Sequence, residues 1–108
     1  MIEIVRYLPA SGRDVFGEWL ANLDSRSRAK VITRLDRLAL GNFGDCKSLR
    51  RGVSELRIDW GTGYRVYYGR VGTAIVLLLC GGDKRKQSTD IERAIEYLEE
   101  FRRREGRP

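Results

Sequence analysis

An almost unbroken apolar run in the second half of the chain, TAIVLLLC at residues 73–80, limits the fold more than any other stretch. A strand with one face in water alternates apolar and polar residues, whereas this run is apolar at nearly every position. It is far too short to cross a bilayer, which takes about 20 apolar residues in a helix. We therefore expect a central strand whose two faces are both covered, ended by Gly81-Gly82.

A β-hairpin is predicted just before this strand, in SELRIDWGTGYRVYYGR at residues 54–70. Apolar and polar residues alternate on both sides of Gly61-Thr62-Gly63, which indicates two short strands joined by a three-residue loop. In that register Ile58 faces Val66 on the apolar side of the hairpin. That side is expected to pack against the core.

The polar side of the hairpin carries two arginines and a tyrosine. The same register pairs Asp59 with Arg65 and places Arg57 opposite Tyr67. Two interpretations remain open for Arg65. It is neutralised by Asp59 in an ordinary cross-strand ion pair worth well under about 1 kcal/mol, or it serves a ligand site.

The rest of the chain predicts one more strand and three helices. Residues 2–8 are rich in β-forming types, and apolar residues recur at helical spacing within 15–23, 31–39 and 91–101. The last helix has Ser88, Thr89 or Asp90 as its cap. These elements predict a single α+β domain over residues 1–108, in the order β-α-α-β-β-β-α. The sheet is expected to be small and mainly antiparallel, with helices on one face and the other face partly open.

Charge and cysteine content narrow the classes of function. The net charge is +6 with a pI near 9.7, which favours a polyanionic partner over a merely soluble basic domain. With no histidine, a Ser-His-Asp or Cys-His catalytic set is excluded within the chain, and no metal site or cofactor is expected. Two cysteines fit the reducing cytoplasm, and the N-terminus MIEIVRYLPAS lacks the apolar segment of a signal peptide.

Basic residues lie just before the hairpin, within residues 47–51, and just after the apolar strand, at residues 84–86. We expect them to converge at one edge of the polar face, where they would fit a phosphate backbone, with a tyrosine ring stacking on a base. A solvated turn is the simpler interpretation of residues 84–86. The predicted RNA-contacting residues are Lys47, Arg50, Arg51, Tyr67 and Arg85.

The order of these motifs resembles a known family. LRRGVSELRIDWGTGYRVYY, the apolar strand, and then GGDKRKQSTDIERAIEYL resemble the RelE/ParE superfamily of bacterial toxins, most closely the HigB-like branch of phage Gp49-like or addiction module killer proteins. The resemblance covers nearly the whole chain. It implies a RelE-like, microbial-RNase-like fold and, as in ribosome-dependent members, cleavage of mRNA in the ribosomal A site. Arg57, Arg65 and Lys84 match the functional basic residues of the family, with Arg85 and Lys86 as neighbours.

RNA cleavage without a metal uses the 2′-hydroxyl of the substrate as the nucleophile, so the protein must move protons and stabilise charge on the phosphorane. The base is a carboxylate or a lysine that loses its proton because like charges crowd it. Glu55 is a candidate base, although a role as ion-pair partner of Arg57 or Lys84 is the simpler interpretation. The predicted catalytic residues are Arg57, Arg65, Lys84 and Lys86.

The resemblance also implies a partner, and it leaves the target open. An antitoxin, often a HigA-like helix-turn-helix protein, is expected beside mRNA on the ribosome, and no membrane is involved. The chain lacks both a histidine and a clear tyrosine in or after its basic turn, which leaves the general acid unassigned. A ParE-like inhibitor of DNA gyrase is therefore the alternative function, and a binding module without activity is a third.

Overall fold

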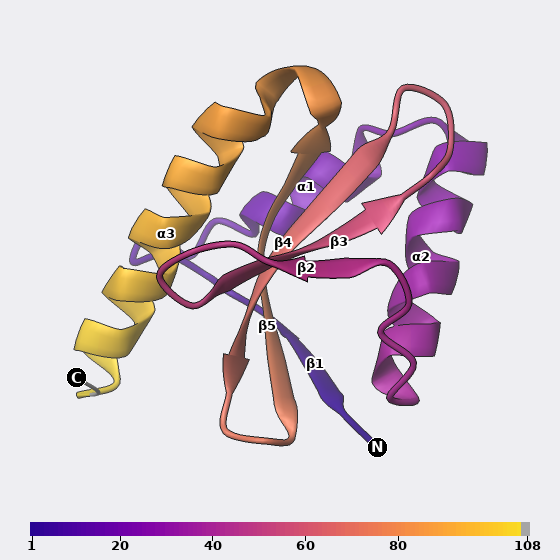
Figure 1. Cartoon of the computed structure of the whole chain (residues 1–108). Helices are drawn as coiled ribbons and strands as arrows, with labels where there is room; N and C mark the ends of the chain where they lie inside the picture. The colour runs from indigo at the N-terminus through magenta and orange to yellow at the C-terminus, as the bar shows by residue number, and fades with distance from the viewer. Residues whose placement is uncertain (107–108) are drawn as a thin grey trace.

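The computed structural model describes residues 1–106. Within them, five strands form one sheet, and three α-helices and a single 3₁₀ turn, η1, complete the fold (Figure 1). The elements are β1 (Glu3–Arg6), α1 (Val15–Ala21), α2 (Ser25–Ala39), β2 (Cys46–Ser48), β3 (Val53–Ile58), β4 (Tyr64–Val71), β5 (Ile75–Asp83), η1 (Lys84–Lys86) and α3 (Gln87–Arg104).

The strands lie in the order β1-β5-β4-β3-β2, with β1 parallel to β5 and every other pair antiparallel. The predicted α+β class is confirmed, and β5 lies inside the sheet between β1 and β4, as its apolar run predicts. Strand β2 is not among the elements that the sequence predicts. Its three residues are too few for an alternating pattern to be visible in the sequence.

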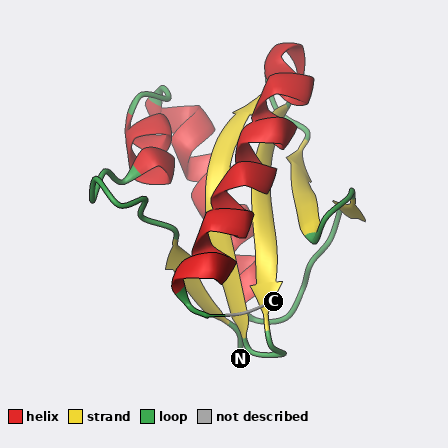
Figure 2. Cartoon of the chain, turned by 90° about the vertical axis from the view of Figure 1, so that its left-hand side faces the viewer, coloured by secondary structure: helices red, strands yellow, loops and turns green. Residues whose placement is uncertain are grey.

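Helices cover both faces of the sheet, so the expectation of a partly open face is wrong. Figures 1 and 2 show α3 on one side and the α1–α2 pair on the other. The run on β5 supplies both cores, because Leu77 and Leu79 pack under α3 while Val76 and Leu78 pack under α1 and α2. Its unbroken apolar character needs two covering layers.

The β3–β4 hairpin forms with a register different from the predicted one. Its turn spans residues 59–63, so Arg57 lies directly opposite Arg65, and Ile58 opposite Tyr64. The shift is two residues, and because side chains alternate with a period of two, every side chain keeps its predicted face. The error came from counting Trp60 as part of the strand. Its indole instead bonds to Ser27 of α2.

The start of α3 also differs from the prediction. Asp83 accepts a hydrogen bond from the backbone N–H of Arg85 and caps η1, and α3 continues from η1 at Gln87. Asp90 therefore lies inside the first turn of α3 and caps nothing.

Candidate functional site

A hollow of about 330 Å³ opens where β3 ends, β4 begins and η1 follows β5. The β3–β4 turn forms one wall, and the backbone N–H of Lys84 donates to the carbonyl oxygen of Gly63 at 3.1 Å, which fixes η1 against that turn. Charged side chains of both signs line the hollow: Arg57, Arg65, Lys84, Asp45 and Asp59.

The two arginines of the hollow lie directly opposite each other on β3 and β4. Like charges in that position repel, so something must hold them together. Glu55 holds the two arginines together. It lies on β3 two residues before Arg57, so its side chain is on the same face of the sheet. Its side chain is 1% exposed, and its Oε2 accepts a hydrogen bond from Nε of Arg57 at 3.0 Å, while its Oε1 lies 3.4 Å from Nε of Arg65. One buried carboxylate thus bridges both guanidinium groups.

Glu55 approaches both arginines through Nε. In residues 1–106 no side-chain hydrogen bond uses an Nη of Arg57 or Arg65. The pair therefore keeps its terminal N–H groups, the ones that form a bidentate contact with phosphate. Gln87 at the start of α3 completes the site by donating to Oε1 of Glu55 at 3.1 Å. The bond from Glu55 also raises the pKa of Arg57 above its usual range.

The polar contents of the hollow suit an anion. Arg57, Arg65 and the ammonium of Lys84 supply three positive charges from three adjacent segments. Two guanidiniums side by side match the oxygens of a phosphate, and Asp45 and Asp59 add carboxylates that can accept a proton. Arg65, with a side chain 13% exposed, is the most buried of the cations.

The remaining residues of the basic turn lie on the other side of η1. The guanidinium of Arg85 is exposed and pairs with Asp83 at 2.9 Å, and Lys86 lines a second groove rather than the hollow. Lys47 of β2 lies opposite Glu55 in the register, in the row next to the arginine pair, and is exposed. The structure therefore brings Arg57, Arg65 and Lys84 together in the hollow. Lys47, Arg85 and Lys86 lie near the hollow but do not line it.

Arg50 and Arg51 lie elsewhere, so the expected convergence is wrong for these two. They belong to the turn before β3, at the end of that strand opposite the hollow, and they form ion pairs with Glu92 and Glu99 of α3. Arg51 has a left-handed backbone conformation, φ 55°. Both side chains attach the β2–β3 turn to the outside of α3.

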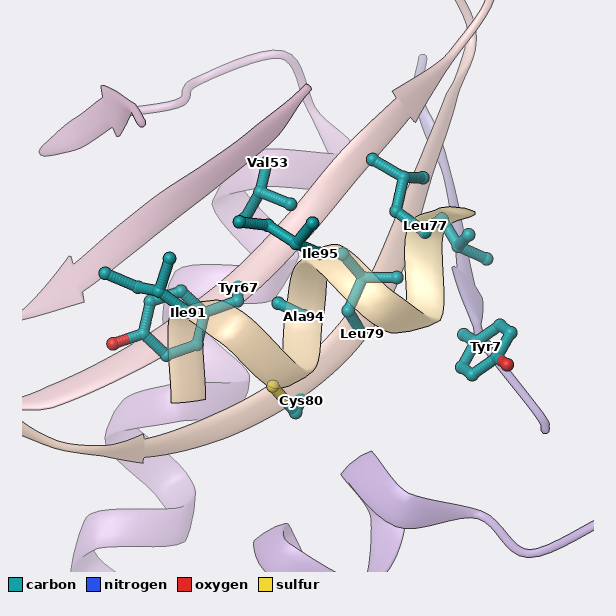
Figure 3. Packing of buried hydrophobic residues seen from close by; sticks show 10 residues of the cluster. Tyr7, Val53, Tyr67, Leu77, Leu79, Cys80, Ile91, Ala94 and Ile95 are labelled. Atoms are coloured by element: carbon teal, nitrogen blue, oxygen red, sulfur yellow. The ribbon is translucent and has the colours of Figure 1, made fainter. Parts of the chain in front are cut away.

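The predicted stacking platform is also wrong. The ring of Tyr67 is 0% exposed and packs under α3 beside Ile91 and Ala94 (Figure 3). Burial raises the pKa of its phenol well above the usual value. The prediction failed because it assumed that this face of the sheet was open.

Two groups that lie at this site were not predicted as functional. Asp45 comes next to Arg57 because the backbone N–H of Arg57 donates to its carbonyl oxygen at 2.9 Å, and this pairing depends on the unpredicted strand β2. Gln87 follows the basic turn directly, but only the fold of η1 aims it at Glu55. The role of Glu55 as a partner of Arg57 is confirmed.

Two general properties complete the description of residues 1–106. No group of three histidine, cysteine or acidic side chains in this range lies close enough to hold a metal ion. None of the helices in it combines the length and apolar character needed to cross a membrane.

Comparison with known proteins places the chain in a family. The family model described as phage-derived protein Gp49-like (DUF891) matches residues 18–107. An uncharacterised protein from Haemophilus influenzae is 51% identical over 80 residues, which cover 73% of this chain and 81% of that protein. The chain belongs to the Gp49-like family, part of the addiction-module-killer, RelE-like group of toxins, and this membership indicates in general the toxin of a toxin–antitoxin pair whose partner is an antitoxin.

Proposed function

We propose that this protein is an endoribonuclease toxin that cuts mRNA on the ribosome and thereby stops translation. The observation that carries the proposal is the pair of arginines that Glu55 holds side by side with their terminal N–H groups free. Family membership and the net charge of +6 support it. The cytoplasm, where mRNA is translated, is the proposed place of action.

In the proposed reaction the scissile phosphate occupies the hollow. Its oxygens accept hydrogen bonds from Arg57 and Arg65, whose positive charge stabilises the phosphorane. The 2′-oxygen forms a bond to phosphorus, the bond to the 5′-oxygen breaks, and no metal is required. One group takes the 2′-hydroxyl proton, and another gives a proton to the leaving oxygen. Lys84, Asp45 and Asp59 line the hollow and are the candidates for these two tasks. Lys86 is proposed to add positive charge from the far side of η1.

The role of Lys84 is open to a direct test. An arginine at this position keeps the positive charge but cannot give up a proton. If Lys84 transfers a proton, Lys84→Arg should lower the single-turnover cleavage rate by about 100-fold, within the usual contribution of acid–base catalysis, and should remove one limb of the pH–rate profile. Equal rates for Lys84→Arg and wild type would restrict Lys84 to an electrostatic contact and leave the carboxylates as the proton-transfer groups.

Primer extension on a translated message tests the function itself. Expression of wild type should produce new 5′ ends within coding sequences, whereas a ParE-like gyrase inhibitor should leave the message intact and block supercoiling. Growth arrest without either effect would contradict both activities. Growth that continues without arrest would indicate a binding module without toxic activity.

A further inference from the structure

A second groove, of about 550 Å³, lies across η1 from the hollow. Helix α1, the end of β5, η1 and the first turns of α3 form its walls. Its lining includes Trp19, Lys86, Asp90 and Arg93. Lys84 lines the hollow while its neighbours on η1 line the groove, so the two sites share this turn. Trp19 also touches Tyr64 of the hollow, with ring centroids 6.3 Å apart.

Asp90 is the unusual residue of the groove. It is 5% exposed, and its Oδ2 is buried without a hydrogen-bond partner in residues 1–106. Its Oδ2 packs onto the backbone at Gly82. A Cβ at that position would lie 1.9 Å from this oxygen, so only glycine fits there. Asp90 does not cap α3, because the helix begins three residues earlier without a side-chain cap.

This carboxylate is costly where it lies. Burial raises its pKa, and of the charged groups that face it, Arg93 and Lys86 favour the ionised form while Asp83 opposes it. The phenol of Tyr67 and the thiol of Cys80 are its buried titratable neighbours. Buried polar groups nearly always have hydrogen-bond partners, and an unpaired one costs on the order of 1–3 kcal/mol. Asp90 therefore keeps an unused capacity to accept a hydrogen bond at the wall of the groove.

We propose that the groove binds the base of an unpaired nucleotide next to the cleaved phosphate, with Asp90 accepting hydrogen bonds from N–H groups of the base and with a preference for guanine. The assignment rests on the proposed function. Unpaired RNA bases are read on their Watson–Crick edges, and the guanine edge carries an imino and an amino donor. Uracil presents one imino group between two carbonyl oxygens, which a carboxylate repels. Lys86 and Arg93, which form no ion pair within residues 1–106, face the phosphate of that nucleotide.

An acidic peptide is the other ligand that a basic groove attracts. It fits less well here, because its carboxylates would meet Asp90, Glu18 and Asp83 among the lining residues. Asp83 forms an ion pair with Arg85, and Glu18 forms one with Arg13. Among these three acids, Asp90 is therefore the one left to bind a ligand. A ligand with donors at one end and negative charge at the other satisfies both parts of the groove.

Binding of guanosine and uridine monophosphates tests this assignment without any cleavage. The chain has two tryptophans, so in a Trp60→Phe background the fluorescence of Trp19 reports on the groove. Guanosine monophosphate should bind about tenfold more tightly than uridine monophosphate, the low end of discrimination by a base-reading pair. Asp90→Asn should reduce that preference to about twofold or less, whereas Lys86→Ala should weaken both nucleotides alike. Asp36→Asn, an exposed acid on α2, is the matched control.

Unfolding of Asp90→Asn separates the binding role from a structural one. Because the folded pKa of Asp90 is raised, its destabilising effect is absent below the unfolded pKa near 3.8 and grows as pH rises through the folded value. Asp90→Asn should therefore be more stable than wild type at pH 7, with the difference vanishing at pH 3. A less stable variant at pH 7 would show that the protein itself satisfies Asp90 and would overturn the assignment.

Equal affinities for the two nucleotides in wild type, an undiminished preference in Asp90→Asn, or displacement of guanosine monophosphate by poly-glutamate but not by inorganic phosphate would each overturn it as well. These results are distinct from failure of the proposed function. Guanine preference without mRNA cleavage would contradict the endonuclease alone, and cleavage without guanine preference would contradict the base site alone.

Discussion

Replacing Arg65 with alanine is expected to lower the rate of mRNA cleavage by about 100-fold or more, since removing one preorganised donor to a charged transition state has an effect of that size. Arg65 is the most buried cation of the hollow, with Glu55 at its Nε and its terminal N–H groups free. The rate should be measured in single-turnover reactions on purified ribosomes that carry a defined message. In cells the same substitution should abolish growth arrest.

Two variants make this result specific. Arg65→Lys keeps the charge but loses the planar fork, so it should recover only part of the lost rate. Arg70→Ala removes an exposed arginine from the same strand, and this variant should cleave like wild type. The guanidinium of Arg70 lies away from the hollow, where it donates to the carbonyl oxygen of Thr73. An Arg65→Ala protein that is folded and as active as Arg70→Ala would refute the arginine clamp.

Glu55→Ala should destabilise the fold by about 3 kcal/mol, because removing one member of a buried ionic group leaves charge uncompensated. Here the uncompensated groups are Arg57 and Arg65, directly opposite each other on neighbouring strands. Urea unfolding followed by circular dichroism measures the change. Glu55→Gln keeps the shape and one acceptor oxygen, so it should cost less.

Glu92→Ala is the control for this stability measurement. Glu92 is exposed and pairs with Arg50 on the surface, so its loss should cost under about 1 kcal/mol. If Glu55→Ala lost no more stability than Glu92→Ala, the bridge between the two arginines would contribute nothing to the fold. In that case the arginine pair would have to be held by the strands alone.

The sequence was sufficient for the parts of the fold that repeat over several residues. The apolar run of β5 and the alternation in β3 and β4 placed the sheet, and helical stripes placed α1, α2 and α3. Faces were predicted correctly even where the register was not, because the hairpin slipped by two residues and side-chain direction has a period of two. The turn is longer than predicted because Trp60 lies outside the strand and its indole N–H donates to Ser27 of α2. This is a tertiary contact, and the alternation of residue types does not reveal it.

The site was predictable in part for a related reason. Arg57 lies near the end of β3, Arg65 near the start of β4 and Lys84 just after β5, and these ends of three neighbouring strands meet, so strand order alone brings the residues together. Arg50 and Arg51 are near in sequence but lie at the other end of β3, where acids of α3 neutralise them. These contacts depend on which face of the sheet α3 covers, and no local sequence pattern predicts that face.

Cleavage of a defined message by purified protein, with and without programmed ribosomes, tests directly whether this protein is a ribosome-dependent endonuclease. Such an enzyme should cut within the codon at the decoding site when ribosomes are present, should make no comparable cut in naked RNA, and should make no cut when it carries Arg65→Ala. A message that stays intact on translating ribosomes, at protein concentrations that arrest growth, would contradict the central claim.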